Sequence, residues 1–178
     1  IGDTITFTYN IEYLDAAGLM PLKLPNSQNP YIKAFWQWWP TAYKSLKIFR
    51  MTGGEPLMDK NTFKILEYVN ENPKFDLELS ITSNLSPPDD DLMEKFINAV
   101  QALERPRIWS AGDAINPDSG NEWSIAPAVR HFSVFVSVDT VGAQAEYLRS
   151  NLNYDYMMTN VRRIMIDTNG TEITFINT

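Results

Sequence analysis

Short apolar runs alternate with longer segments of helical spacing along most of this chain. The apolar runs are bounded by glycine, proline or polar residues, and this pattern is typical of β-strands. The predicted strands are 46–52, 77–83, 132–138 and 172–178. The predicted helices begin near residue 59 and cover 92–103 and 154–167. This alternation predicts an α/β fold with a mostly parallel sheet and helices outside it.

Three further segments have less regular patterns. Alternation at residues 5–9 indicates a β-rich start. Asn29 followed by Pro30 is typical of a helix N-cap and first turn, and we expect Pro40 to end the aromatic helix that follows. Its apolar residues at helical spacing are Tyr31, Ile32, Phe35, Trp36, Trp38 and Trp39. The periodicity fades at 105–130, which we interpret as a long, partly ordered loop.

Composition narrows the possible functions. The chain has 178 residues, which suits one domain. Its net charge of −7 argues against nucleic-acid binding, since that needs clustered Lys and Arg. No apolar stretch approaches the roughly 18–20 residues of a membrane span. With no cysteine and one histidine, the chain cannot form a disulfide or a cysteine-held metal site, and we expect no metal ligands.

Polar residues follow the predicted strands, at the end where parallel α/β folds bind ligands. The candidates are Thr52-Gly53-Gly54-Glu55, Ser83-Asn84, Ser137 with Asp139, and Asn177-Thr178. Such a series is expected of a ligand-binding rim.

The most distinctive of these motifs is Gly53-Gly54-Glu55-Pro56. Paired glycines can adopt positive φ and let a ligand approach the backbone, and a carboxylate could accept hydrogen bonds from an ammonium group. The same residues would also suit a tight turn with a solvated Glu55, and spacing alone does not separate the two interpretations.

The order of several motifs resembles the radical S-adenosylmethionine superfamily. Segment 49–58 runs as a strand into Gly-Gly-Glu-Pro and resembles the second barrel strand. Segment 79–84 resembles the third strand with its terminal Asn, and 136–142 the fourth with its Ser-x-Asp ending. Segment 146–149 resembles the acidic–hydrophobic–Arg segment that comes next. The Trp-rich helix at 29–40 resembles the twitch-domain subgroup.

This resemblance implies a partial (β/α) TIM-like barrel that binds S-adenosylmethionine at its open top. In the family, a [4Fe–4S] cluster cleaves this cofactor reductively to a 5′-deoxyadenosyl radical. By similarity, Gly53, Gly54 and Glu55 would contact the methionine ammonium. Ser137 and Asp139 would contact the ribose or nearby atoms, and Arg149 the methionine carboxylate. Two weaker candidates for the same pocket are Ser83 and Asn84.

The family holds its cluster with a Cys-x3-Cys-x2-Cys loop, whereas this chain has no cysteine. We therefore expect residues 1–178 to be an interior fragment, truncated at both ends, with roughly the second to fifth barrel strands. The full-length parent would be a cytoplasmic enzyme that carries the cluster, and residues 1–178 alone would be inactive. Their truncated edges could self-associate. The substrate stays undetermined, and we expect neither nucleic-acid nor membrane partners.

Two alternatives remain open. The chain could be a non-catalytic α/β binding module that keeps the barrel frame without the cluster. It could also be an unrelated nucleotide-binding domain, although Glu55 would then place negative charge where a phosphate should lie. Other residues have structural interpretations: His131 as a structural or surface residue, and the acidic run 89–91 as a helix cap.

Overall fold

The computed structural model describes residues 16–18, 28–110, 123–149 and 151–177. The chain divides into two compact units, Ile1–Ser45 and Leu46–Thr178. The first unit contains helix α2 (Pro30–Ser45). Among the described residues, no helix combines the length and apolar character needed to cross a membrane.

The second unit contains all the strands of the described residues. Its elements are, in chain order, β1 (Ile48–Met51), η2 (Pro56–Met58), α3 (Lys60–Glu71), β2 (Lys74–Ser83), α4 (Asp90–Glu104), β3 (Arg107–Ser110), β4 (Trp123–Ala126), β5 (Val129–Ser137), α5 (Ala143–Leu148), α6 (Tyr154–Asp167) and β6 (Glu172–Ile176). The four predicted strands and the three helices predicted between them are confirmed, and α6 has the predicted bounds.

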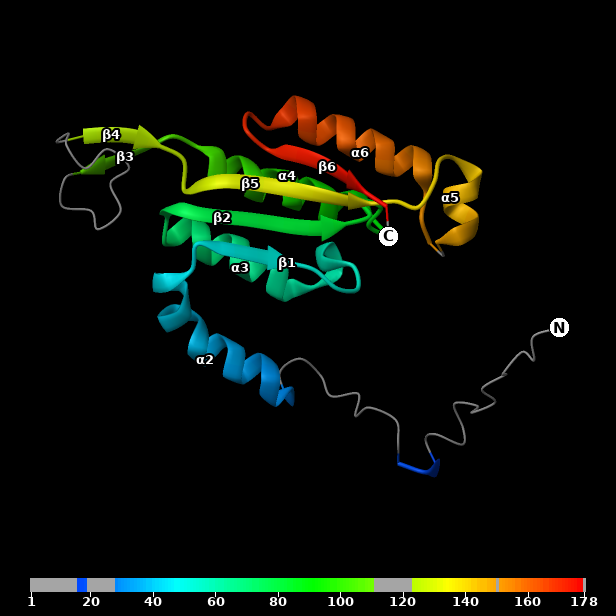
Figure 1. The fold of residues 1–178 in the computed structure, drawn as a ribbon, viewed down its shortest axis with the longest axis horizontal. Helices are drawn as coiled ribbons and strands as arrows, with labels where there is room; N and C mark the ends of the chain where they lie inside the picture. The colour runs from blue at the N-terminus through cyan, green and yellow to red at the C-terminus, as the bar shows by residue number, and fades with distance from the viewer. Residues whose placement is uncertain (1–15, 19–27, 111–122, 150, 178) are drawn as a thin grey trace. The chain divides into compact units, whose positions relative to one another are not determined.

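Four of these strands form a parallel sheet in the order β1-β2-β5-β6 (Figure 1). The register aligns Met51 with Ile81, Ile81 with Val134, and Val134 with Ile173. Residues in one such row lie on the same face of the sheet, because side chains alternate along each strand. The sheet therefore has one strongly apolar face.

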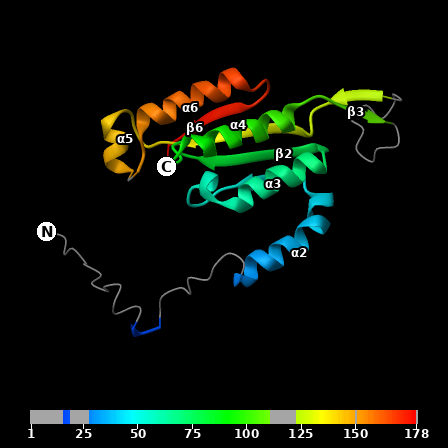
Figure 2. The ribbon, with the colours of Figure 1, turned by 180° about the vertical axis from the view of Figure 1, so that it is seen from behind.

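Helices α3, α4 and α6 cover that apolar face, as the view from behind shows (Figure 2). Each helix turns an apolar stripe inward: Phe96 and Val100 of α4 are fully buried, as are Met157 and Ile164 of α6. Apolar residues at this spacing share one side of a helix, so burying them fixes how the helix lies on the sheet. The opposite face of the sheet carries none of these three helices.

Two predicted helix starts have the expected caps. The Asn29 side chain accepts a hydrogen bond from the backbone N of Tyr31 at 3.0 Å, at the start of α2. Asp89 does the same for Leu92 at 2.9 Å at the start of α4. Capping by the acidic run is therefore confirmed. A side-chain oxygen that binds an otherwise unpaired N–H of the first turn typically stabilises a helix by about 1 kcal/mol.

The prediction that Pro40 ends the aromatic helix is wrong, because α2 continues through Pro40 to Ser45. Proline removes one backbone hydrogen bond and costs about 3 kcal/mol in a helix interior. Ring contacts offset this cost: Trp39 lies 5.5 Å from Tyr43 across the proline, and 5.3 Å from Phe35 before it. Each such contact contributes about 0.5–1.5 kcal/mol.

The interpretation of 105–130 as a long, partly ordered loop is wrong for the residues that form strands. Strands β3 and β4 pair there in antiparallel fashion, with Ile108 opposite Ile125. Both isoleucines are exposed, while Trp109 on the alternate position is buried and donates from Nε1 to the Ala126 carbonyl at 3.2 Å. Because these exposed positions are apolar, the two segments lack the alternation of apolar and polar residues that would have predicted strands.

Of the predicted partial barrel, the structure confirms the α/β fold with a parallel sheet. The described residues form an open four-stranded parallel sheet with helices, and no closed barrel is present among them. The predicted alternation at 5–9 and the last residue of the predicted strand 172–178 lie outside the described residues.

Candidate functional site

A cavity of about 260 Å³ lies at the carboxyl ends of the parallel strands. Its lining comes from the loop after β1, the end of β2, the end of β5 and the residue after α5. The lining residues are Thr52, Gly53, Gly54, Glu55, Thr82, Ser83, Asn84, Ser137 and Arg149. Parallel α/β folds bind ligands at this edge, so the cavity is the candidate site.

The two glycines of the β1 loop have the positive φ angles expected of them. Gly53 has φ = 96° and Gly54 has φ = 55°. A Cβ atom on either glycine would meet no atom within 4 Å. Glycine is therefore required by the backbone conformation, which other residues rarely adopt, rather than by crowding.

Glu55 connects the β1 loop to the end of β2. Its Oε1 accepts hydrogen bonds from Ser83 Oγ at 2.6 Å and from the backbone N of Leu57 at 3.1 Å. Its Oε2 accepts from the backbone N of Asn84 at 3.0 Å. The carboxylate is half-buried and caps the short helix η2. The end of β2 is thereby fixed against the β1 loop.

The same carboxylate keeps acceptor capacity for a ligand. A carboxylate has about four acceptor positions, and the described residues supply three donors to Glu55. Two of these donors go to Oε1 and one to Oε2. By this count Oε2 can accept a hydrogen bond from one further donor, such as an ammonium group.

Arg149 is the positively charged residue in the lining of the cavity. It follows α5 as the C-cap residue, and its guanidinium pairs with Asp139, with Nε to Oδ2 at 2.6 Å and Nη2 to Oδ1 at 3.2 Å. The hydrogen bond with Asp139 raises the pKa of Arg149, and this effect exceeds the opposing effect of burial. Asp139 therefore orients the guanidinium and keeps it charged.

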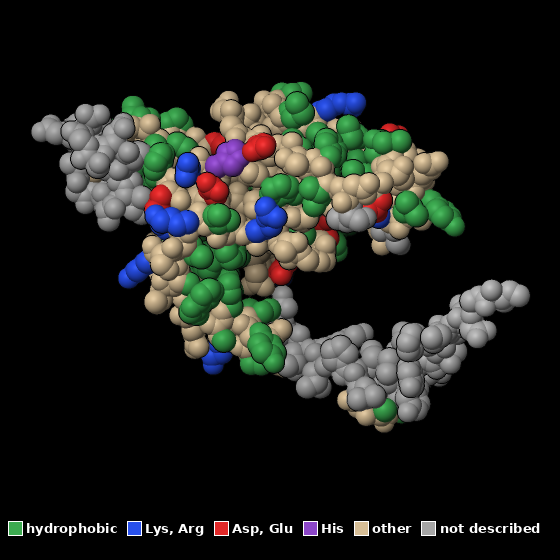
Figure 3. Space-filling model, viewed as in Figure 1, with side chains coloured by type: hydrophobic (Ala, Val, Ile, Leu, Met, Phe, Trp, Pro, Cys, Tyr) green, Lys and Arg blue, Asp and Glu red, His purple; other side chains and the backbone are tan. Residues whose placement is uncertain are grey.

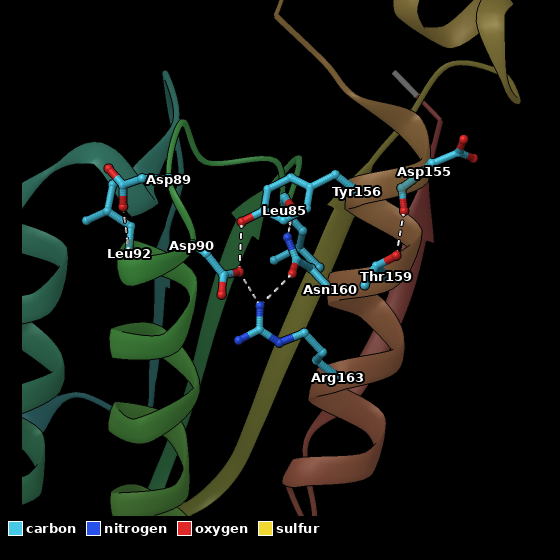
Figure 4. Close-up of polar contacts among 9 residues, drawn as sticks. All are labelled: Leu85, Asp89, Asp90, Leu92, Asp155, Tyr156, Thr159, Asn160 and Arg163. Atoms are coloured by element: carbon cyan, nitrogen blue, oxygen red, sulfur yellow. Dashed lines mark hydrogen bonds and ion pairs between the residues drawn. The ribbon is translucent and has the colours of Figure 1, made fainter.

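A second hydrogen-bond network holds the loop that follows β2. Leu85 has φ = 50°, its backbone N donates to Ser83 Oγ at 2.9 Å, and its carbonyl accepts from Asn160 Nδ2 at 2.9 Å. Figure 4 shows Asn160 reaching Leu85 from α6, with Arg163 bridging Asn160 and Asp90. Asn160 is fully buried, so its hydrogen bond to the loop is shielded from water.

The structure brings seven of the eight predicted site residues into the lining of one cavity: Gly53, Gly54, Glu55, Ser83, Asn84, Ser137 and Arg149. The eighth, Asp139, is not part of the lining and instead binds Arg149. Asn177 of the expected rim is also absent from the lining, and Thr178 lies outside the described residues.

Two residues of this region were not predicted from the sequence. Thr82 lines the cavity one residue before Ser83, and Asn160 holds the loop behind it. Asn160 has a signal in the sequence, since it interrupts the apolar stripe formed by Met157, Val161 and Ile164. A polar residue on a buried helix stripe needs a partner, and that partner is the Leu85 carbonyl.

No group of three or more His, Cys, Asp or Glu side chains within the described ranges could hold a metal ion. His131 lies away from the cavity and its Nε2 is 2.8 Å from Glu172 Oε2. The chain has no cysteine, so its residues do not fit a cysteine-held iron–sulfur cluster.

Comparison of the chain with protein-family models gives no match. Comparisons with curated proteins and with solved structures give none either. The functional interpretation is therefore based on the fold and the cavity.

Proposed function

We propose that the cavity binds the methionine end of S-adenosylmethionine. The observation that carries this proposal is that Glu55 and Arg149, which are far apart in the sequence, line the same small cavity. A zwitterionic amino acid needs an acceptor for its ammonium group and a cation for its carboxylate. The cavity offers one of each.

Each ionic end of the ligand has a partner suited to it. The ammonium group would bind Glu55 at Oε2, which receives fewer protein donors than Oε1. The carboxylate would bind the Arg149 guanidinium, whose planar array of N–H donors suits carboxylates. The glycines leave the backbone of the β1 loop uncovered, so a ligand could approach it closely.

The size of the cavity fits one end of the cofactor rather than all of it. Its volume of about 260 Å³ is smaller than the roughly 300–1,000 Å³ of pockets that enclose a whole small molecule. The rest of the ligand would extend over the neighbouring sheet face. In a partial (β/α) barrel, which remains our interpretation of this sheet, that face would be the inner one.

The proposal is confined to binding. The residues of this chain do not fit a [4Fe–4S] cluster, so they support no reaction step through such a cluster. Reductive cleavage of the cofactor remains a proposal for a longer parent protein.

A non-catalytic binding module is the second candidate, and one observation favours it. Glu55 is held by Ser83 and Asn84, and Arg149 is held by Asp139. Charged groups that satisfy one another within the chain can serve to fix loops. In that case the cavity would be a consequence of the loop structure, without affinity for a zwitterion.

Calorimetric titration with S-adenosylmethionine separates the two candidates. We expect saturable binding by the unmodified chain, and about tenfold or greater weakening in Glu55→Gln and Arg149→Gln, because each removes one charge-assisted contact. Glu94→Gln and Arg162→Gln are matched controls at exposed positions outside the cavity. No binding, or equal binding by all four variants, would contradict the proposal.

A further inference from the structure

The sheet face opposite the helices carries a row of mostly polar side chains that leads toward the cavity. On β1 this face presents Arg50, two residues before Thr52 of the cavity. The register places Ser80 beside Arg50, and Ser133 beside Ser80. Figure 3 shows this side of the sheet, where charged and hydrophobic side chains are mixed.

Arg50 is held in a defined position on this face. Its guanidinium carbon lies 4.3 Å from the centroid of the Phe135 ring, and its Nε donates to Ser80 Oγ at 3.3 Å. A guanidinium held over the face of an aromatic ring can still donate hydrogen bonds from its N–H groups. Arg50 is therefore oriented before any ligand binds, although the residue is exposed.

The charge of Arg50 is not neutralised within the described residues, since none of their carboxylates lies within ion-pair distance of it. Two carboxylates of the same sheet have other partners. Glu78 pairs with Arg130 at 3.4 Å, and Glu172 pairs with His131 at 2.8 Å. An oriented arginine without a carboxylate, next to a cavity, is suited to binding an anion.

The geometry points to a substrate subsite: we propose that Arg50 binds an oxyanion of the substrate, a carboxylate or a phosphate, on the sheet face opposite α3, α4 and α6, beside the cavity. This inference deepens the proposed function and rests on it, because it assigns a charge to the molecule that would lie next to the cofactor. Arg50 and Thr52 are about 6.6 Å apart along the strand. A ligand at Arg50 would therefore lie close to one in the cavity without sharing its contacts.

The test uses the full chain without S-adenosylmethionine, titrated with inorganic phosphate and separately with acetate at constant ionic strength. The Nε–Hε resonance of Arg50, assigned by its loss in Arg50→Lys, reports binding by the unmodified chain, and the backbone amide resonances of Ser80 and Phe135, whose side chains contact Arg50, report it in the variants as well. We expect a saturable shift, and about tenfold weaker anion binding in Arg50→Gln because a charge-assisted pair is lost. Stronger binding of phosphate would indicate a phosphorylated substrate, and stronger binding of acetate a carboxylic acid.

Arg130→Gln is the matched control, since it removes the same charge from β5 of the same sheet, where the arginine already pairs with Glu78. It should leave anion binding unchanged, and Phe135→Leu should weaken it. Equal binding by Arg50→Gln and the unmodified chain, or no saturable shift, overturns the inference. Calorimetry with S-adenosylmethionine on Arg50→Gln keeps the two proposals distinct, because the cavity contacts remain in that variant.

Discussion

Ser83 Oγ donates to Glu55 Oε1 at 2.6 Å, so one carboxylate joins the ends of two neighbouring parallel strands. Ser83 is almost fully buried, and its Oγ also accepts from the backbone N of Leu85. The site is therefore part of the fold as well as a candidate binding surface. Substitutions in it should change stability in ways that the hydrogen bonds define.

The first prediction concerns Glu55→Gln. Either orientation of the new amide places an NH₂ group against a backbone N–H, of Asn84 or of Leu57, where an oxygen now accepts. We expect a loss of about 1–3 kcal/mol in the free energy of unfolding, measured by urea denaturation. Glu94→Gln, at an exposed position on α4, should change it by less than about 0.5 kcal/mol. Similar values for the two variants would contradict the role assigned to Glu55.

The second prediction concerns Gly54, whose φ of 55° lies in the left-handed region. A Cβ there meets no neighbour, so only backbone strain should matter. Gly54→Ala should cost about 1–2 kcal/mol, and Gly54→Asn less, because Asn tolerates this region better. Urea denaturation of both variants checks the order. An alanine variant as stable as glycine would show that the loop has another conformation.

The third prediction is a pH dependence from Asp76, which pairs with the buried Lys74 and with Lys47. Burial raises the pKa of Asp76, but hydrogen bonds and charges from the two lysines together lower it by more, so it lies below its usual value. A carboxyl with a lowered native pKa stabilises the fold above its ordinary pKa of about 3.9, and this contribution disappears as the pH falls through the native value.

Asp76→Asn should therefore lower the free energy of unfolding at pH 7, by about 1–3 kcal/mol, because it leaves Lys74 without its carboxylate. It should also flatten the decline in stability below about pH 4. Urea denaturation at several pH values checks both effects. Glu94→Gln, which removes an exposed carboxylate, should keep the decline of the unmodified chain. A steeper decline in Asp76→Asn would contradict a lowered pKa of Asp76 in the folded chain.

The fourth prediction concerns Asn160, the buried side chain that holds the Leu85 carbonyl. Asn160→Ala removes that hydrogen bond and should cost about 1–3 kcal/mol. It should also speed amide hydrogen exchange at Leu85 and Ser86, because the loop loses its support from α6. Thr159→Ala, on the exposed neighbouring position of α6, should leave exchange in this loop unchanged. If exchange at Leu85 and Ser86 is unchanged in both variants, Asn160 does not stabilise this loop.

The sequence predicts the main sheet well because its four strands are apolar and bounded by clear turn residues. It fails where tertiary contacts override local signals. Ring contacts across Pro40 keep α2 continuous, and exposed Ile108 and Ile125 hide the alternation of β3 and β4.

Most of the candidate cavity was predictable for a simple physical reason. Residues that end adjacent parallel strands must meet at one edge of the sheet. The partners of each side chain were not predictable, since they depend on loop conformation. Asp139 could be placed near the site from sequence, for example, but not its pairing with Arg149. Asn160 comes from a helix distant in sequence, and only the packing of α6 brings it to Leu85.

The most direct test of the proposed binding mode compares S-adenosylmethionine with its decarboxylated analogue, using the unmodified chain and Arg149→Gln. If Arg149 binds the methionine carboxylate, the substitution should weaken binding of S-adenosylmethionine by about tenfold or more and leave binding of the analogue unchanged. An equal loss for both ligands would show that Arg149 only shapes the loop through Asp139. That result, or no binding of either ligand by the unmodified chain, would contradict the proposal.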